Sequence, residues 1–198
     1  MKSSPPYFVV FEGLDGTGKT TCARLTAEHL GAVYMTTPSP TIRQFRQALL
    51  DDFDGCQEAC QLFYLATVFK ASVDVGKLLA AGRSVVLDRY FLSTQAYAEF
   101  RSSALAIDDV ERHLLPADLT VMLDAPLSVR RARIVERGES DADHETLGDG
   151  ADVFLRGAHM KRAQLPVAGK LITVDTSLAL PTEVSCAVLA ELGRLHAG

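Results

Sequence analysis

Several features that define whole classes of protein are missing from this chain of 198 residues. It has four cysteines but no CxxC pair, and no apolar run approaches the ~20 residues that a membrane-spanning helix needs. Residues 1–6 are polar and proline-rich, so we expect no secretory signal. The formal net charge of −5 argues against general affinity for nucleic acids or acidic membranes. These absences favour a cytoplasmic protein with reduced thiols that binds neither nucleic acid nor membrane.

The composition is that of a single packed domain. Hydrophobic residues make up 47% of the chain, and its length is within the range of one domain with a substantial core. No internal repeat and no linker divides the sequence, so we expect one domain over residues 1–198. Cys56 and Cys60 are four residues apart, on one face of a helix, but no His or Cys pair completes a metal site.

A phosphate-binding P-loop lies near the start of the chain. Gly13, four residues, and then Gly18-Lys19-Thr20 fit the pattern, between a short apolar run and a helical stretch. Glycines let backbone N–H groups turn toward a phosphate, and the helix N-terminus adds partial positive charge. Lys19 is expected to reach the β- and γ-phosphates, and Thr20 to bind Mg²⁺. The full set expected to bind ATP is Gly13, Asp15, Gly16, Thr17, Gly18, Lys19, Thr20 and Thr21.

Predicted strands alternate with predicted helices along the chain. This order is typical of an α/β fold, a parallel sheet with helices on both faces. The expected strands cover residues 7–12, 33–36, 84–87, 119–123 and 171–174. The expected helices cover residues 19–30, 41–51, 58–81 (ended by Gly82), 93–100, 127–137, a stretch from about 152, and 181–195.

Polar residues follow three of these strands. The P-loop, Asp88-Arg89 and Asp124 each come where a predicted strand ends. Open parallel sheets bind ligands outside the carboxyl ends of their strands. We therefore expect these residues to be neighbours in the folded protein.

Four stretches of the chain together resemble the thymidylate kinase family. They are Phe11–Thr21 with the P-loop, Asp88–Tyr97 with its Asp-Arg-Tyr and Ser-Thr-Gln-Ala-Tyr runs, Leu123–Pro126 followed by Arg130, Arg131, Arg133 and Arg137, and Val174–Ser177. The last of these is similar to the family's segment beside the adenine pocket. The four occur in the family's order and span nearly the whole chain.

This resemblance implies a P-loop kinase fold with a five-stranded parallel sheet and a short lid at about 133–152. The implied reaction is ATP-dependent phosphorylation of a pyrimidine nucleoside monophosphate, most directly dTMP to dTDP, with Mg²⁺. Catalysis of that type is placement plus charge stabilisation. Lys19 would bind the phosphates of ATP, and Thr20 and Asp88 would help to bind Mg²⁺. Arg89 would bind the phosphate of the acceptor nucleotide through its guanidinium group.

The resemblance also implies an acceptor site. Asp15 would accept a hydrogen bond from the sugar, although a turn-stabilising role is the alternative. Phe63 would stack on the base, although helix aromatics usually pack into the core. Thr94 and Gln95 would reach the base, or lie exposed on their helix. The whole expected acceptor set is Asp15, Arg43, Phe63, Thr67, Arg89, Thr94, Gln95 and Tyr97.

The catalytic cation is expected to come from the lid. Some relatives carry an arginine in the P-loop, just before the position of Thr17, where this chain has Gly16. Arg133 and Arg137 fit the role by their spacing, so they join Lys19, Arg89 and Asp15 as expected catalytic residues. The alternative is that the arginines between 130 and 137 form a solvated helix face.

Two departures bear on the acceptor. Thr36-Thr37-Pro38 stands where the family carries a charged pair, and Thr67 stands where it carries a base-contacting arginine. A lost base contact can cost discrimination by orders of magnitude. The alternatives are therefore a kinase of a modified pyrimidine nucleotide or a nucleoside, and a non-catalytic nucleotide-binding regulatory module. Intact Lys19 and Arg89 argue against the latter.

Three further expectations concern the surface. Residues 138–150 are acidic and have no apolar period, so they are expected to form a loop. His144 and His159 are expected on the surface, since phosphoryl transfer of this type needs no histidine base. The family resemblance implies a homodimer with the helix near 58–81 in its interface.

Overall fold

Five parallel strands form one sheet in the computed structural model, which describes residues 5–138 and 145–197, with side chains to residue 195. The strand order is β2-β3-β1-β4-β5. The strands are β1 (Phe8–Gly13), β2 (Val33–Thr36), β3 (Val85–Asp88), β4 (Leu119–Asp124) and β5 (Lys170–Asp175). The five-stranded parallel α/β fold expected from the sequence is confirmed.

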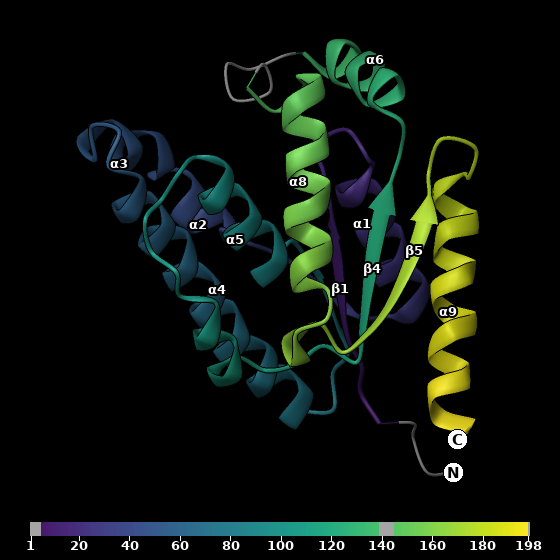
Figure 1. Cartoon of the computed structure of the whole chain (residues 1–198). Helices are drawn as coiled ribbons and strands as arrows, with labels where there is room; N and C mark the ends of the chain where they lie inside the picture. Colours follow the sequence, from purple (N-terminus) through teal and green to yellow (C-terminus); the bar gives the residue numbers. More distant parts are fainter. Residues whose placement is uncertain (1–4, 139–144, 198) are drawn as a thin grey trace.

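Alternating side chains of β1 feed two separate cores. Phe8 and Val10 pack with α4 (Gln57–Ala80) and α5 (Phe91–Phe100) on one face of the sheet. Val9 and Phe11 pack with α1 (Lys19–Leu30) and α9 (Pro181–Ala197) on the other. Burial on both faces explains why β1 is a continuous apolar run rather than an alternating one. Figure 1 shows α9 on the far side of the sheet from α4 and α5.

The helices follow the predicted order, with some differences in their bounds. The expected helix at 41–51 is two short helices, α2 (Pro40–Arg43) and α3 (Arg46–Asp52), separated by a turn at Gln44 and Phe45. That turn is closed by Phe45 N–H donating to Ile42 O at 3.0 Å, a three-residue bond that interrupts the α-helical ladder.

Another difference lies near the lid. After α6 (Leu127–Arg137), α8 (Asp149–Arg162) begins earlier than the predicted residue 152 and takes 149 and 150 out of the expected loop. Residues 139–144 of that loop lie outside the described residues. Short 3₁₀ turns at Asp108–His113 and Pro166–Ala168 were not predicted.

The helix end predicted at Gly82 is confirmed. Gly82 has a φ of 72°, and its N–H donates to Leu79 O at 2.9 Å. Arg83 N–H then donates to Leu78 O at 3.0 Å, so these two carbonyls at the end of α4 are both satisfied.

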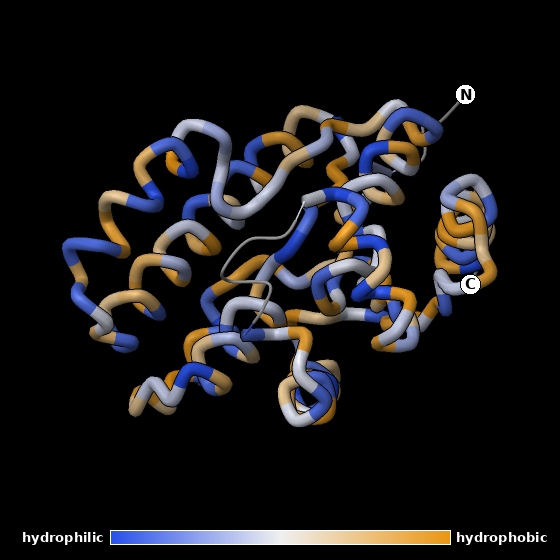
Figure 2. Tube along the Cα trace, turned by 90° about the horizontal axis from the view of Figure 1, so that it is seen from above, coloured by the Kyte–Doolittle hydropathy of each residue, from blue (hydrophilic) through white to orange (hydrophobic). Residues whose placement is uncertain are grey.

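The carboxyl ends of the strands meet at one edge of the sheet, at the top of Figure 1. In register, Phe11 pairs with Asp88, Gly13 with Leu123, and Asp124 with Asp175. The expected convergence of the P-loop, Asp88 and Asp124 is therefore confirmed. Figure 2 views the molecule from this edge, with hydrophobic and hydrophilic residues alternating along the helices.

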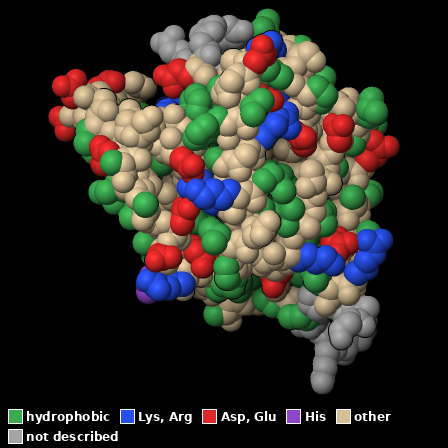
Figure 3. All heavy atoms as spheres, viewed as in Figure 1, with side chains coloured by type: hydrophobic (Ala, Val, Ile, Leu, Met, Phe, Trp, Pro, Cys, Tyr) green, Lys and Arg blue, Asp and Glu red, His purple; other side chains and the backbone are tan. Residues whose placement is uncertain are grey.

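The surface around α8 carries charges of both signs side by side (Figure 3). Arg156 pairs with Asp124 and Asp152, and Arg162 pairs with Glu99 and Asp108. Among the residues that the structure describes, no helix is both long enough and apolar enough to cross a membrane.

Candidate active site

The P-loop joins β1 to α1, as its sequence context predicted. Gly16 and Gly18 have φ values of 81° and 86°. A Cβ on Gly13 would lie 2.3 Å from Leu123 O, and one on Gly16 would lie 2.8 Å from Arg130 O. These glycines therefore allow a backbone path and a packing distance that no other residue permits.

Lys19 lies beneath this loop and is only 5% exposed. Its Nζ donates to Leu14 O at 2.6 Å. Burial, followed by the positive charge of Arg89, lowers the pKa of the Lys19 ammonium to about 7. Thr17 is fully buried, and its hydroxyl also donates to Leu14 O, at 2.8 Å, so this side chain holds the loop in shape.

Thr20 and Asp88 meet across the sheet edge. The Thr20 hydroxyl donates to Asp88 Oδ2 at 2.6 Å, and the Tyr34 hydroxyl donates to the same oxygen at 3.2 Å. Asp88 Oδ1 is buried and has no hydrogen-bond partner among the described residues. A hard cation with its waters fits such an oxygen pair beside a phosphate loop. The expected metal pair is thus brought together, and Thr21 follows it, exposed, on α1.

A cavity of about 380 Å³ opens beside the P-loop, between α4 and α5. Nine residues expected at the site line it: Asp15, Thr20, Arg43, Thr67, Asp88, Arg89, Thr94, Tyr97 and Arg137. Arg46, Gln61, Tyr64 and Arg101 also line it and were not predicted.

Asp15, Arg89 and Tyr97 form one cluster at the inner end of the cavity. Arg89 has a φ of 69° and makes an ion pair with Asp15. The Tyr97 hydroxyl donates to the other Asp15 oxygen at 2.6 Å. Burial alone would raise the pKa of Asp15, but Arg89 and Lys19 hold it well below its usual range. The Asp15 carboxylate therefore stays charged and fixes both partners in place.

A buried carboxylate that sequence reasoning missed supports this cluster. Glu12, on β1, accepts from Tyr90 N–H at 2.9 Å and from Ser93 N–H at 3.2 Å, and also bonds the Ser93 hydroxyl. Burial raises the pKa of Glu12. The carboxyl group satisfies the N-terminus of α5 and so positions Arg89. A Glu inside an otherwise apolar strand was the available signal.

His159 was predicted to lie on the surface, and that prediction is wrong. It is 2% exposed, with Nδ1 2.8 Å from Leu155 O and Nε2 3.5 Å from Ser93 Oγ. Its ring meets the Tyr97 ring edge-on. Burial lowers its pKa to about 4, so it packs as a neutral ring behind the cavity wall. His144 lies outside the described residues.

The loop after β2 lies next to a positively charged side chain of α2. Arg43 Nη2 donates to Thr36 Oγ1 at 2.8 Å and to Pro38 O at 3.2 Å. The Thr37 hydroxyl donates to Arg89 O at 2.7 Å, and the Thr37–Pro38 peptide is cis. A guanidinium therefore stands at this edge of the cavity although the loop itself has no charged residue.

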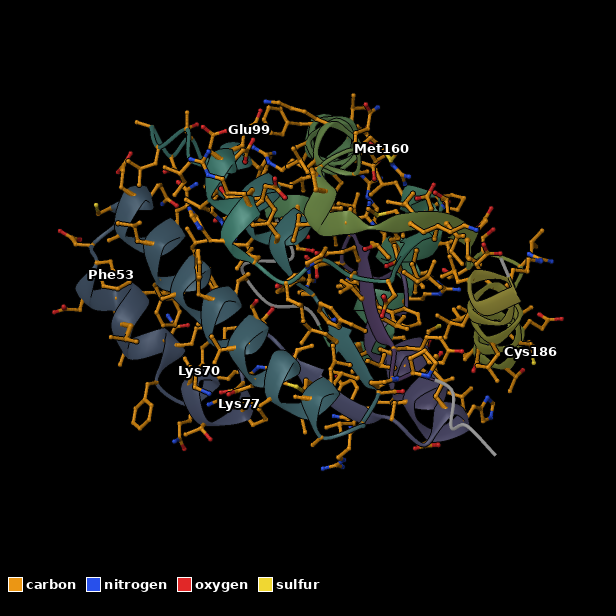
Figure 4. The ribbon with its side chains drawn as sticks, turned by 90° about the horizontal axis from the view of Figure 1, so that it is seen from below. Phe53, Lys70, Lys77, Glu99, Met160 and Cys186 are labelled. Carbon is orange, nitrogen blue, oxygen red and sulfur yellow. The ribbon has the colours of Figure 1, made fainter. Side chains whose placement is uncertain are left out.

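One face of α4 lines the cavity, and it carries Tyr64 rather than Phe63. The lining positions are Gln57, Cys60, Gln61, Tyr64 and Thr67, at helical spacings of three and four. Phe63 lies off this stripe, with its ring 6.2 Å from the Phe53 ring and 5.1 Å from the Tyr64 ring. Figure 4 shows Phe53 at the end of the molecule opposite α9, which carries Cys186.

Gln95 is also away from the cavity lining. It is 1% exposed, and its Oε1 accepts from Gln61 Nε2 at 2.6 Å. It therefore supports the cavity wall from behind, whereas Thr94 lies in the lining itself.

Three of the four arginines of α6 lie in different surroundings. Arg130 is fully buried, donates to Asp15 O at 2.6 Å and pairs with Asp152, so it is not part of a solvated face. Arg133 donates to Thr176 O at 2.6 Å and to Gly16 O at 3.3 Å. Arg137 lines the cavity. The structure thus separates the two arginines that were expected to share a role.

Comparison with known proteins assigns the fold and the sequence to one family. Residues 11–181 match the family model for thymidylate kinase. A probable thymidylate kinase of Pyrococcus horikoshii is 33% identical over 146 residues, which cover 67% of this chain and 71% of that protein. A thymidylate kinase of Leptospira interrogans is 29% identical over 158 residues, or 74% and 78% of the two chains. The thymidylate kinase structure from Candida albicans superposes with a TM-score of 0.76 at 21% identity, covering 98% of this chain and 95% of that one.

Proposed function

The chain belongs to the thymidylate kinase family, and we propose that it transfers the γ-phosphoryl group of ATP to dTMP. A phosphate oxygen of dTMP attacks the γ-phosphorus, and the bond from that phosphorus to the β-phosphate oxygen breaks. The products are dTDP and ADP. The observation that carries this proposal is the Asp15–Arg89–Tyr97 cluster, which joins the P-loop to the cavity.

The residues divide into donor and acceptor groups. The P-loop from Gly13 to Thr20 holds the ATP phosphates, with Lys19 beneath them. Arg133, tied to Thr176, borders the adenine side. Mg²⁺, when bound, neutralises charge on the β- and γ-phosphates. Thr20 and Asp88 are the side chains that would hold it with its waters.

On the acceptor side, Arg89 and Arg43 hold the dTMP phosphate at the inner end of the cavity. Asp15 and Tyr97 face the sugar, and the base extends between α4 and α5. Arg137 projects from the end of α6, at the start of the lid segment 133–152, and supplies positive charge to the transferring group. Such an enzyme would use ATP and dTMP in the cytoplasm.

A coupled assay of ADP release tests the reaction directly. Purified protein with ATP and Mg²⁺ is offered dTMP, dUMP, dCMP, dGMP and thymidine in turn. We expect dTMP to give the highest kcat/KM. Turnover of thymidine but of no monophosphate, or no turnover of any acceptor, would contradict the proposal.

Tyr64 is proposed as the aromatic side chain that stacks on the base. Tyr64→Ala should raise the KM for dTMP about tenfold to hundredfold, because base–aromatic stacking contributes on the order of 1–3 kcal/mol. Phe63→Ala is the matched variant, since its ring packs against Phe53 outside the cavity lining. It should lower the melting temperature and leave the KM for dTMP unchanged. The reverse pattern would restore Phe63 as the stacking residue.

A homodimer through α4 is proposed as well. Leu62 and Val73 are 53% and 55% exposed, and with Ala66 and Phe69 they form an apolar stripe at spacings of four and three. Wild-type protein should show twice the 21.4 kDa chain mass by light scattering, and Leu62→Arg should shift it to the monomer. Leu178→Arg, at an even more exposed leucine beyond β5, should leave the dimer intact. A monomeric wild type would exclude this interface.

A further inference from the structure

The base end of the cavity contains few free hydrogen-bond donors. The Thr67 hydroxyl donates to Tyr64 O at 2.7 Å, and the Thr94 hydroxyl donates to Tyr90 O at 2.9 Å. Each hydroxyl therefore gives its only hydrogen to its own helix and presents lone pairs to the cavity. These two threonines, one on each wall, can accept from a base but have no hydrogen left for its carbonyl oxygens.

The polar atoms of the Gln61 side chain are likewise used in hydrogen bonds within the protein. Its Nε2 donates to Gln95 Oε1 at 2.6 Å and to Leu105 O at 3.3 Å, and its Oε1 accepts from the Ser103 hydroxyl. Both amide hydrogens and the amide oxygen are thus used within the wall, where Gln61 is 3% exposed. Gln61 shapes the cavity without offering it a donor.

Arg101 is a donor that the wall leaves available. It follows α5 one turn after Tyr97, with Cζ 6.0 Å from the centre of the Tyr97 ring. Its Nε and Nη2 both donate to Glu145 Oε2 at 3.3 Å, and the Glu145 side chain is 59% exposed. Arg46, on the α3 side, donates from Nε to the Tyr64 hydroxyl at 2.6 Å, so it lies against α4 rather than beside Tyr97. Nη1 of Arg101 donates no hydrogen bond among the described residues, so Arg101 combines free N–H groups with a place beside the sugar-side aromatic, Tyr97.

We propose that Arg101 determines acceptor specificity by donating a hydrogen bond to a carbonyl oxygen of the pyrimidine base. This inference rests on the proposed function and deepens it. Thymine presents two carbonyl oxygens and one ring N–H. The threonine lone pairs suit the N–H, whereas a buried carbonyl without a donor is costly. Arg101, directly after α5, supplies the hydrogen-bond donor that a carbonyl oxygen of thymine needs.

The first test compares Arg101→Ala with Arg112→Ala, an exposed arginine outside the cavity lining. Arg101→Ala should lower kcat/KM for dTMP about tenfold to hundredfold, mainly through KM, because a hydrogen bond to a charged donor is lost. The KM for ATP should stay unchanged in both variants. Wild-type KM for dTMP in Arg101→Ala would overturn the proposal.

An acceptor without a base separates base recognition from general charge. 2-Deoxyribose 5-phosphate, as a competitor of dTMP, should have the same Ki in wild type and in Arg101→Ala. A Ki that rises by the same factor as the KM for dTMP would show that Arg101 acts only on the phosphate, and would overturn the proposal. Arg101→Lys keeps the charge but loses the planar fork, so it should recover only part of the loss.

The contact with Glu145 provides the remaining control. If Arg101 acted only by tethering the segment that carries Glu145, Glu145→Ala should reproduce the loss in dTMP binding. We expect Glu145→Ala to keep the wild-type KM for dTMP. Calorimetry can measure the binding of dTMP to wild type and to each variant directly, without turnover. A failure of the Arg101 proposal can therefore be distinguished from a failure of the proposed kinase function.

Discussion

Lys19→Ala is expected to lower kcat for dTMP phosphorylation by about 10³-fold, the upper range for removing one preorganised charged donor. Lys19 is buried beneath the P-loop, with its Nζ held by Leu14 O. In such a site a positive charge acts on the phosphates with little screening by water. Burial, followed by the positive charge of Arg89, lowers the pKa of Lys19 to about 7, and a neighbouring phosphate would favour the charged ammonium.

The measurement is the coupled ADP-release assay at saturating ATP and dTMP. Lys161→Ala is the matched control, because that lysine is on the surface of α8, where its side chain is 64% exposed, and only contacts Glu99 at 3.7 Å. It should keep full activity. Both variants should unfold within a few degrees of wild type, so that a loss of activity is not a loss of fold. Lys19→Ala with activity near wild type would remove the P-loop from the reaction.

Arg137→Ala is expected to lower kcat by about 10³-fold, the lower range for removing an arginine that stabilises a transferring phosphoryl group. The P-loop cannot supply this charge itself, because a side chain at Gly16 would press on the backbone of Arg130. Arg137 lines the acceptor cavity at the end of α6. It therefore lines the same cavity as Arg89, where we propose that the acceptor phosphate binds.

Arg133→Ala is the informative partner variant. Arg133 is four residues earlier on the same helix and donates to Thr176 O, which we propose lies on the ATP side. Its loss should raise the KM for ATP and change kcat less than tenfold. Initial rates over a matrix of ATP and dTMP concentrations separate the two effects. If Arg133→Ala loses kcat while Arg137→Ala does not, the two roles are exchanged.

Much of the site could be predicted because its parts are local in sequence. The spacing of Gly13, Gly18, Lys19 and Thr20 specifies a phosphate loop, since backbone torsions and a helix N-terminus do the binding. The apolar runs specify strands buried on both faces. Parallel topology then brings Asp88 and Asp124 to the same edge as the P-loop.

The rotation of each helix about its own axis decides which of its side chains face the cavity. A turn of about 100° per residue separates Tyr64, in the cavity, from Phe63, against Phe53. The family resemblance selected Phe63, whereas the structure places Tyr64 in the cavity lining and Phe63 outside it. The same applies to α6, where Arg130 turns into the core and Arg137 into the cavity.

The amino-acid sequence by itself determined the element order, the phosphate loop and the family, because these depend on short patterns read in order along the chain. Only the tertiary structure decided that His159 is buried, that Glu12 supports α5 from β1, and that Tyr64 rather than Phe63 lines the cavity. Those properties arise from contacts between segments far apart in the chain, such as the hydrogen bonds from Tyr90 and Ser93 to Glu12. Tertiary packing determines these properties, and no short pattern along the sequence specifies them.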